Sequence, residues 1–246
     1  MASRLFFILF SLIFWDCASR VISHIPSTEE SFPFSKQILW IQSANELRLK
    51  NQSLDKDFIE LSLEEPFLQS FTKETTAKYR MASFQFEETL QKSCTKQSID
   101  EIKKETGKVT IKGKLTGSDC SSDYQIVFVS KSETEIEFNI TLTDPTLNRI
   151  QFQYGSHPEE RIYGLGEQFT YDELKGKKPF LFTEEQGIGR GDQPITTGAN
   201  LLAGAGGNVY TTYAPIPHYI TSDNRSVFFE NSGYANFDFS NSKKTR

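Results

Sequence analysis

The sequence predicts an all-β protein built as an antiparallel β-sandwich. Apolar and polar residues alternate in many short stretches, among them residues 46–50, 59–63, 83–87 and 108–112, and alternation with a period of two is typical of half-buried strands. Turn-forming residues separate the stretches, as in sandwiches and barrels. The chain also contains 21 Phe and 9 Tyr, and aromatic residues favour pleated surfaces.

Composition limits the kinds of partner. The chain has 246 residues, 37% of them hydrophobic, and a net charge of −5, which gives room for one large or two small domains. An acidic balance argues against a nucleic-acid partner, because no basic surface is available to neutralise phosphates. There are only three His and no His/Cys cluster with ligand spacing, so we expect no metal and no cofactor.

Residues 1–19 have the pattern of a signal peptide. Arg4 precedes an apolar run over residues 5–15, and the small residues Cys17 and Ser19 occupy the −3 and −1 positions of a cleavage site. The run is too short for a membrane anchor, since a spanning helix needs about 20 apolar residues. We therefore expect the secretory pathway, with an extracellular or lysosomal destination. Residues 20–45 look like a leader, which places the sandwich domain at residues 46–246.

That compartment changes how the cysteines and asparagines are interpreted. Cys94 and Cys120 remain after signal removal, and a pair in an oxidising compartment suggests a disulfide, the alternative being two unpaired buried residues. Sequons at Asn51, Asn139 and Asn224 are permissive sites for N-glycosylation. Asn139 has further support, because residues 135–142 alternate without error and put it on the polar face of a strand.

The remaining elements follow from local patterns. Residues 124–129 are almost continuously apolar, which indicates a central strand. Residues 98–105 have a helical pattern, with Ser98 as a possible cap, Glu101 three residues later and Gly107 at the end. Strands are also predicted at residues 208–213 and 225–230, and a final one contains Ala235, Phe237 and Phe239.

Residues 161–194 form the most distinctive stretch of the chain. A short strand leads into Gly164 and Gly166, and a second glycine series follows at Gly187, Gly189 and Gly191. Glycine is needed where the backbone takes positive φ or lies close to another surface. Two glycine series around polar residues predict a long shaped loop, and such loops often carry function.

Two motifs in this stretch carry a family resemblance. The run YGLGEQF at residues 163–169 and the run EQGIGRG at residues 185–191 resemble the N-terminal domain of glycoside hydrolase family 31, the α-glucosidase family. The second run is most similar to the branch with bacterial-type α-glucosidases and sulfoquinovosidases. The resemblance implies a galactose-mutarotase-like sandwich, followed in the family by a (β/α)₈ barrel with two catalytic aspartates. A barrel needs about 250 residues, so the resemblance implies that this chain lacks it.

The same resemblance implies a role for the loop at residues 185–193. In the family, a loop of this domain reaches over the barrel mouth, which makes Gln186, Arg190 and Asp192 the expected contacts to an α-glycoside substrate. A guanidinium suits paired hydroxyls or an anionic sugar substituent. The alternative is that Arg190 pairs with Asp192 and only fixes the loop. The parent enzyme would hydrolyse O-glycosyl bonds with retention, and no catalytic residue is expected in this chain.

Two other interpretations stay open at this point. Hydrolysis needs two carboxyls, and five acids lie in or near the loop: Glu167, Glu173, Glu184, Glu185 and Asp192. We expect these to be solvated or to bond the backbone, because charged residues are usually exposed. The rival function is a stand-alone, non-catalytic carbohydrate-binding module of the lectin kind.

Overall fold

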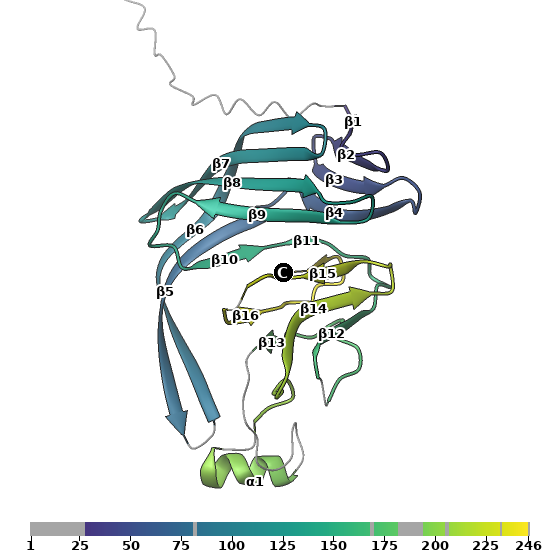
Figure 1. Ribbon diagram of the computed structural model, residues 1–246. Helices are drawn as coiled ribbons and strands as arrows, with labels where there is room; N and C mark the ends of the chain where they lie inside the picture. Colours follow the sequence, from purple (N-terminus) through teal and green to yellow (C-terminus); the bar gives the residue numbers. More distant parts are fainter. Residues whose placement is uncertain are drawn as a thin grey trace, which may run out of the picture.

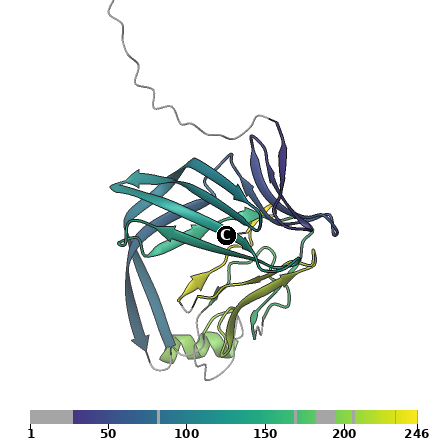
Figure 2. The same cartoon turned by 45° about the horizontal axis from the view of Figure 1, so that its top comes forward.

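The computed structural model describes residues 28–80, 83–167, 170–181, 194–204, 207–231 and 233–245. In these ranges all strand pairs are antiparallel, and there is one α-helix, α1 (Pro194–Ala203). Figures 1 and 2 show the strands stacked in layers, with α1 at the opposite end of the molecule from β1 (Glu30–Pro33). The predicted all-β sandwich is confirmed.

Two large sheets form the first part of the chain. The four-stranded sheet has the order β1-β2-β3-β4, with β2 (Ile38–Gln42), β3 (Glu46–Asn51) and β4 (Lys56–Ser62). The six-stranded sheet has the order β10-β5-β6-β7-β8-β9. Its strands are β5 (Leu68–Arg80), β6 (Ser83–Glu105), β7 (Lys108–Ser118), β8 (Cys120–Ser130), β9 (Ile136–Leu142) and β10 (Arg149–Phe152).

The core lies where these sheets and the C-terminal strands meet. Leu47 and Leu49 of β3 are fully buried at alternate positions, as are Ile126 and Phe128 of β8. They join one cluster that also contains Trp40, whose ring lies 6.1 Å from that of Phe128. Period-two burial of this kind is why these segments are stable as strands and not as helices.

The leader predicted at residues 20–45 is too long. Strands β1 and β2 lie inside that range and pair with each other and with β3, through Trp40 opposite Leu49. The segment at residues 38–42 is buried almost throughout, so it lacks the alternation that reveals a half-buried strand. The sandwich therefore includes residues from Glu30 onward.

The helix predicted at residues 98–105 is wrong, because these residues belong to β6. The pairing with β7 shifts register between Ile99 and Glu101. An extra residue in a strand lets two side chains three apart share one face, and Ile99 and Ile102 both pack against the core. The bulge thus produces the three-residue spacing that resembled a helix.

Smaller sheets complete the second layer. They pair β11 (Tyr154–Gly155) with β17 (Lys244–Thr245), β12 (Ile162–Gly166) with β14 (Pro215–Thr221), β14 with β15 (Ser226–Phe228), and β13 (Phe180–Leu181) with β16 (Ala235–Asn236). The strand predicted at residues 208–213 is wrong, since no strand occupies this stretch. The strand predicted at 225–230 is shorter in the structure, where it is β15.

The glycines of the YGLGEQF run act as predicted on the backbone. Gly164 and Gly166 have φ of 127° and 90°, and the β12–β14 pairing is irregular between them. A Cβ on Gly166 would lie 2.0 Å from the carbonyl oxygen of Ala214. Only glycine therefore allows β12 to approach the segment before β14 this closely.

Candidate functional site at the base of the glycine-rich loop

The three predicted substrate contacts, Gln186, Arg190 and Asp192, lie outside the described residues. The structure does describe the two segments that bound this loop, β13 before it and α1 after it. The long β5–β6 hairpin extends from the six-stranded sheet, and its far end lies beside α1 in both views (Figures 1 and 2). The base of the loop is therefore built from elements that are far apart in the sequence.

A row of aromatic rings surrounds the end of β13. Phe180 lies 6.2 Å from Tyr210 and 6.3 Å from Tyr234, measured between ring centroids. The row continues from Tyr210 to Tyr171 at 5.9 Å and from Tyr234 to Phe86 of β6 at 5.3 Å. Tilted and edge-on rings at these separations attract one another beyond simple area burial. This aromatic row ties the β6 strand, β13 and the 208–213 turn together where the loop begins.

A cation covers the far end of the aromatic row. The Lys177 ammonium lies 4.4 Å from the centroid of the Tyr171 ring, which is within the range of a cation–π interaction. Tyr234 is 38% exposed, and the backbone N–H of Lys178 donates to the Tyr210 hydroxyl at 3.4 Å. Aromatic side chains with a few polar groups beside them are typical of small-molecule sites, and here the rings also pack against each other.

An ion-pair cluster lies near the Tyr234 end. Glu88 of β6 accepts hydrogen bonds from Lys73 Nζ at 2.8 Å and from Arg149 Nε at 2.9 Å. Burial favours protonation of Glu88, but these bonds and the two positive charges outweigh it and hold its pKa below the usual value. Burial and the Glu88 charge raise the pKa of Tyr234. Glu88 is therefore a fixed anion that links β5, β6 and β10.

The two described acids near the loop have different surroundings. Glu173 accepts backbone N–H bonds from Ile162 at 3.0 Å and Lys175 at 2.6 Å, so it fixes the start of β12. Glu167 is exposed at the end of β12. Glu184, Glu185 and Asp192 lie outside the described residues. Across the described ranges, no group of three His, Cys, Asp or Glu is arranged to hold a metal ion.

A buried ion pair that the sequence did not indicate stabilises the neighbouring sheet. Glu160, 2% exposed, accepts hydrogen bonds from Arg225 at 2.8 Å to each carboxylate oxygen and from Ser156 Oγ at 2.7 Å. Burial favours the protonated form, but the Arg225 charge and the hydrogen bonds outweigh it and lower the pKa of Glu160. Lys175 Nζ donates to Ser156 at 2.5 Å. This cluster joins the β11–β12 connection to the β14–β15 turn.

The predicted cysteine pair is joined in the structure. A disulfide links Cys94 in β6 to Cys120 at the start of β8, with the Cα atoms 5.3 Å apart. Gly117 of β7 pairs with both, and a Cβ there would lie 1.9 Å from the Ser93 carbonyl oxygen. The bridge thus fastens the β7–β8 turn onto β6.

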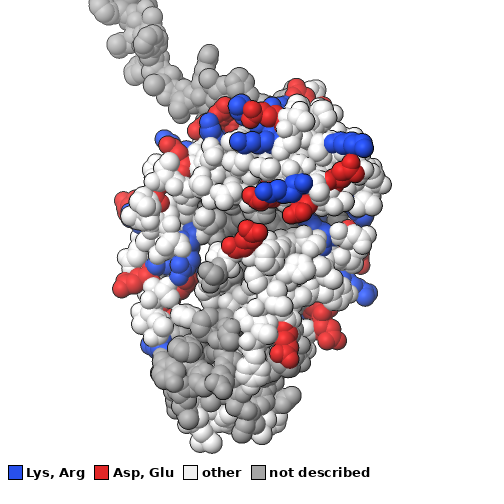
Figure 3. All heavy atoms as spheres, viewed as in Figure 1, with Lys and Arg blue, Asp and Glu red and all other residues white. Residues whose placement is uncertain are grey.

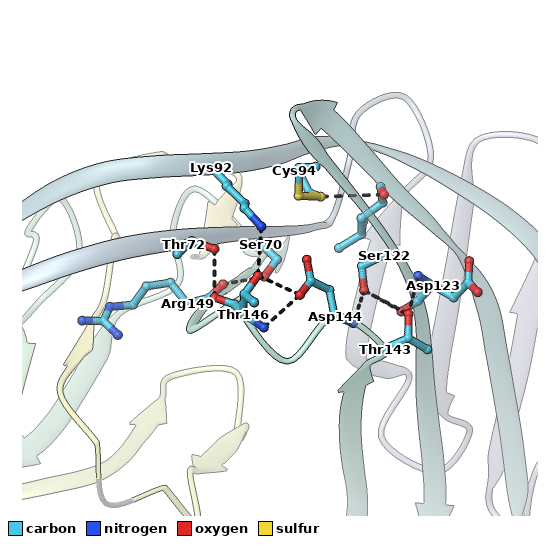
Figure 4. The surroundings of a disulfide bond; sticks show 12 residues. Ser70, Thr72, Lys92, Cys94, Ser122, Asp123, Thr143, Asp144, Thr146 and Arg149 are labelled. Atoms are coloured by element: carbon cyan, nitrogen blue, oxygen red, sulfur yellow. Dashed lines mark hydrogen bonds between the residues drawn. A yellow bond between two sulfur atoms is a disulfide. The ribbon is translucent and has the colours of Figure 1, made fainter.

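Hydroxyl groups of Ser122 and Thr72 make hydrogen bonds to the turn after β9, near this disulfide (Figure 4). The Ser122 hydroxyl accepts from the Asp144 backbone N–H at 3.1 Å, and the Asp144 carboxylate accepts from the Thr146 N–H at 2.9 Å. The Thr72 hydroxyl donates to the Thr146 carbonyl at 2.9 Å. These bonds hold the turn after β9 against β8 and β5, so the cluster is structural.

The three sequons differ in exposure. Asn139 lies on the exposed face of β9, and Asn224 is exposed in the β14–β15 turn with φ of 59°. Asn51 is only 2% exposed, and its side-chain oxygen accepts backbone bonds from Ser53 and Leu54.

Two exposed apolar surfaces flank the loop base. On α1, Ile195 is 54%, Leu201 80% and Leu202 81% exposed. On the β14–β15 sheet, Ile216 and Ile220 are each 49% and Phe228 is 59% exposed. In Figure 3, charged side chains gather over the upper strands β7–β9, and the surface over β12 and β14 carries few of them. In the described ranges no helix is long and apolar enough to cross a membrane.

These features define a class of fold, an antiparallel β-sandwich with one short helix in the described ranges. The chain is similar to a solved family 31 sulfoquinovosidase from E. rectale, in complex with an aza-sugar inhibitor. The TM-score is 0.68 at 23% identity, over 82% of this chain and 29% of that one. At this identity the likeness establishes the fold.

Sequence comparison indicates the particular relatives. The chain is 44% identical to the sulfoquinovosidase of Escherichia coli (strain K12) over 94 residues, which are 38% of this chain and 14% of that enzyme. It is 34% identical to the sulfoquinovosidase of Agrobacterium fabrum over 103 residues, 42% and 16% of the two chains. No protein-family model matches. The predicted relationship, to a part of a family 31 sulfoquinovosidase, is confirmed.

Proposed function

We propose that this chain is the substrate-shaping, barrel-supporting domain of a secreted α-glycosidase that acts on sulfoquinovosides. In this proposal the catalytic aspartates belong to a barrel that these 246 residues do not include. The matched stretches cover only 14% and 16% of the curated sulfoquinovosidases. The signal-peptide pattern at residues 1–19 supports secretion.

One observation carries the proposal: three exposed apolar side chains lie on the outward face of β14 and β15, beside the hydrogen-bonded pair His218 and Ser226. An antiparallel sheet that faces water is normally polar on that side, and β9 follows this rule with Glu137, Asn139 and Thr141 outward. By contrast, Ile216 and Ile220 lie outward on β14 and Phe228 lies outward on β15. Exposed apolar side chains grouped in this way are typical of a surface that another domain covers.

The loop supports the substrate-shaping part of the proposal. It starts at the aromatic row and ends at α1, beside an apolar helix surface that a barrel could also cover. We place Gln186, Arg190 and Asp192 at the substrate, where the guanidinium of Arg190 suits an anionic sugar substituent. A residue on a loop with both ends fixed loses less conformational entropy on binding.

A chimera tests the proposal. Residues 20–246 of this chain replace the equivalent N-terminal part of the E. coli sulfoquinovosidase, and hydrolysis of a chromogenic aryl sulfoquinovoside is measured. We expect turnover by the chimera and none by the chain alone. Arg190→Ala in the chimera should lower kcat/KM at least tenfold with an unchanged melting temperature. Arg161→Ala, at an exposed position outside the loop, is the matched control and should change neither.

Each other outcome counts against a stated part of the proposal. Hydrolysis by the chain alone would refute a missing catalytic barrel. A melting temperature lowered by Arg190→Ala, with activity retained, would make Arg190 a loop-fixing residue. Specific glycan-array binding by the chain alone, with an inactive but folded chimera, would favour the stand-alone carbohydrate-binding module.

A further inference from the structure

The three sequons are the motifs that the proposed function does not use, and the structure separates them. We propose that the folded protein carries an N-linked glycan on Asn139 and none on Asn51, and that the Asn139 glycan shields the free edge of the six-stranded sheet. The proposal rests on the secretory targeting in the proposed function, but not on glycosidase activity.

Asn139 is placed to carry a glycan. It lies at the centre of β9 opposite Val127 of β8, and it is exposed. Side chains two residues apart in a strand share a face, so the sequon residue Thr141 is exposed beside it. The inward residues Phe138 and Ile140 pack against the core. A glycan on Asn139 therefore extends into solvent and disturbs no packing.

Asn51 is placed so that a glycan conflicts with the fold. It ends β3, the strand between β2 and β4, where it pairs with Ile38 and Lys56. Its side-chain oxygen accepts the backbone N–H groups of Ser53 at 2.9 Å and Leu54 at 3.0 Å, the pattern of an Asx turn. With 2% of the residue exposed, an attached sugar has to displace this turn. Folded, secreted molecules are therefore unmodified at Asn51.

The position of Asn139 also gives the glycan a physical role. In the described part of the chain, β9 is the last strand of the sheet order. An edge strand offers unpaired N–H and C=O groups to other chains, and proteins protect such edges with charge or cover. On β9, the Glu137 carboxylate is paired with Lys131 at 2.6 Å, which reduces its value as a repelling charge. A bulky solvated glycan on Asn139, two residues from Glu137, covers the β9 edge in place of that charge.

Peptide mapping of the full chain, expressed with its own N-terminus in a glycosylating secretory host, tests the site assignment. Enzymatic release of N-glycans in ¹⁸O-water converts an occupied Asn to labelled Asp. We expect label at Asn139 in most molecules of the folded, secreted protein and none at Asn51. Unlabelled Asn139, label at Asn51, or retention of the chain in the cytoplasm would each overturn the proposal. None of these results alters the activity of the chimera, so failure here is distinct from failure of the glycosidase assignment.

Two variants test the shielding role. Asn139→Gln removes the sequon and keeps a polar side chain, and Thr141→Ser keeps the sequon and serves as the matched control. By sedimentation velocity at rising concentration, Asn139→Gln should self-associate at least several-fold more strongly than the wild type, and Thr141→Ser should not. If Asn139→Gln stays as monomeric as the glycosylated wild type, the glycan does not shield the edge.

Discussion

Replacing Arg225 by Met should destabilise the fold strongly, because it leaves the buried Glu160 carboxylate without its positively charged partner. Glu160 is 2% exposed, and Arg225 donates to both of its oxygens at 2.8 Å. Methionine fills much of the same space but supplies neither charge nor donors. It also removes the Arg225 bond to the Gly155 carbonyl at 3.0 Å and the guanidinium that lies 5.3 Å from the centroid of the Tyr154 ring.

The expected loss of unfolding free energy depends on the hydrogen bonds that Glu160 keeps. Breaking a buried pair by removing one partner costs about 3–5 kcal/mol. Glu160 retains the Ser156 hydroxyl at 2.7 Å and the His157 N–H at 3.3 Å, so we expect about 3 kcal/mol. In a domain of this size each kcal/mol lowers the melting temperature by about 2–4 °C, which gives a decrease of about 6–12 °C.

Urea denaturation followed by tryptophan fluorescence measures this effect. The double variant Glu160→Gln/Arg225→Met removes both charges of the pair, so it should cost less than Arg225→Met alone. The pKa of Glu160 is lowered in the fold, so its stabilising contribution is present above the ordinary carboxyl pKa and is lost as pH falls through the folded pKa. The Arg225→Met penalty should therefore be present in full at pH 7 and shrink as the pH falls below the ordinary carboxyl pKa. A penalty under about 1 kcal/mol at pH 7, or one that does not change with pH, would refute this account of the pair.

Three further predictions follow from other parts of the fold. Cys94→Ala/Cys120→Ala should cost about 3.5 kcal/mol in the chain-entropy model, measured by urea denaturation against the reduced wild type, which should lose a similar amount. Gly166→Ala should lower the melting temperature far more than Gly176→Ala, since a Cβ on Gly166 meets the Ala214 carbonyl and Gly176, also at positive φ, has open space; equal effects would contradict the close approach of β12. Glu60→Gln should stabilise the fold slightly at pH 7 and have no effect below pH 4. Burial, and then the Glu46 and Asp57 charges, raise the pKa of Glu60 and make its charged form unfavourable. No gain in melting temperature at pH 7 would contradict this.

The sequence predicted the strands whose two faces differ. The alternation in β9 survives in the structure as inward Ile136 and Phe138 and outward Glu137 and Asn139, because only one face is buried. Prediction failed where that contrast is absent. The β2 segment is buried almost throughout, and the bulge in β6 changed the spacing of its apolar residues.

The helix α1 was missed for a related reason. Its sequence PITTGANLLA contains β-branched residues and Gly198, which lower helix propensity. Its exposed residues Leu201 and Leu202 do not form the inward stripe of an amphipathic helix. Pro194 at the first helical position was the available signal. A helix whose apolar residues are exposed cannot be recognised from an inward apolar stripe.

The need for glycine at Gly164 and Gly166 was predictable from the sequence, but the long-range groups around this region were not. Glu160 and Arg225 are 65 residues apart, and the aromatic row collects Phe86, Tyr171, Phe180, Tyr210 and Tyr234 from five separate segments. No local pattern connects such residues, because only the sheet topology brings them together.

The surroundings of three part-buried or buried acids show what those acids do in the fold. Glu88, Glu160 and Glu173 are each held by specific donors, and for Glu88 and Glu160 those donors lower the pKa. A general acid needs the opposite shift, toward neutral pH. These three acids therefore stabilise the packing of the strands. None of the three is therefore a candidate for the general acid of the proposed reaction, and the comparison of the chain alone with the chimera tests which polypeptide supplies that acid.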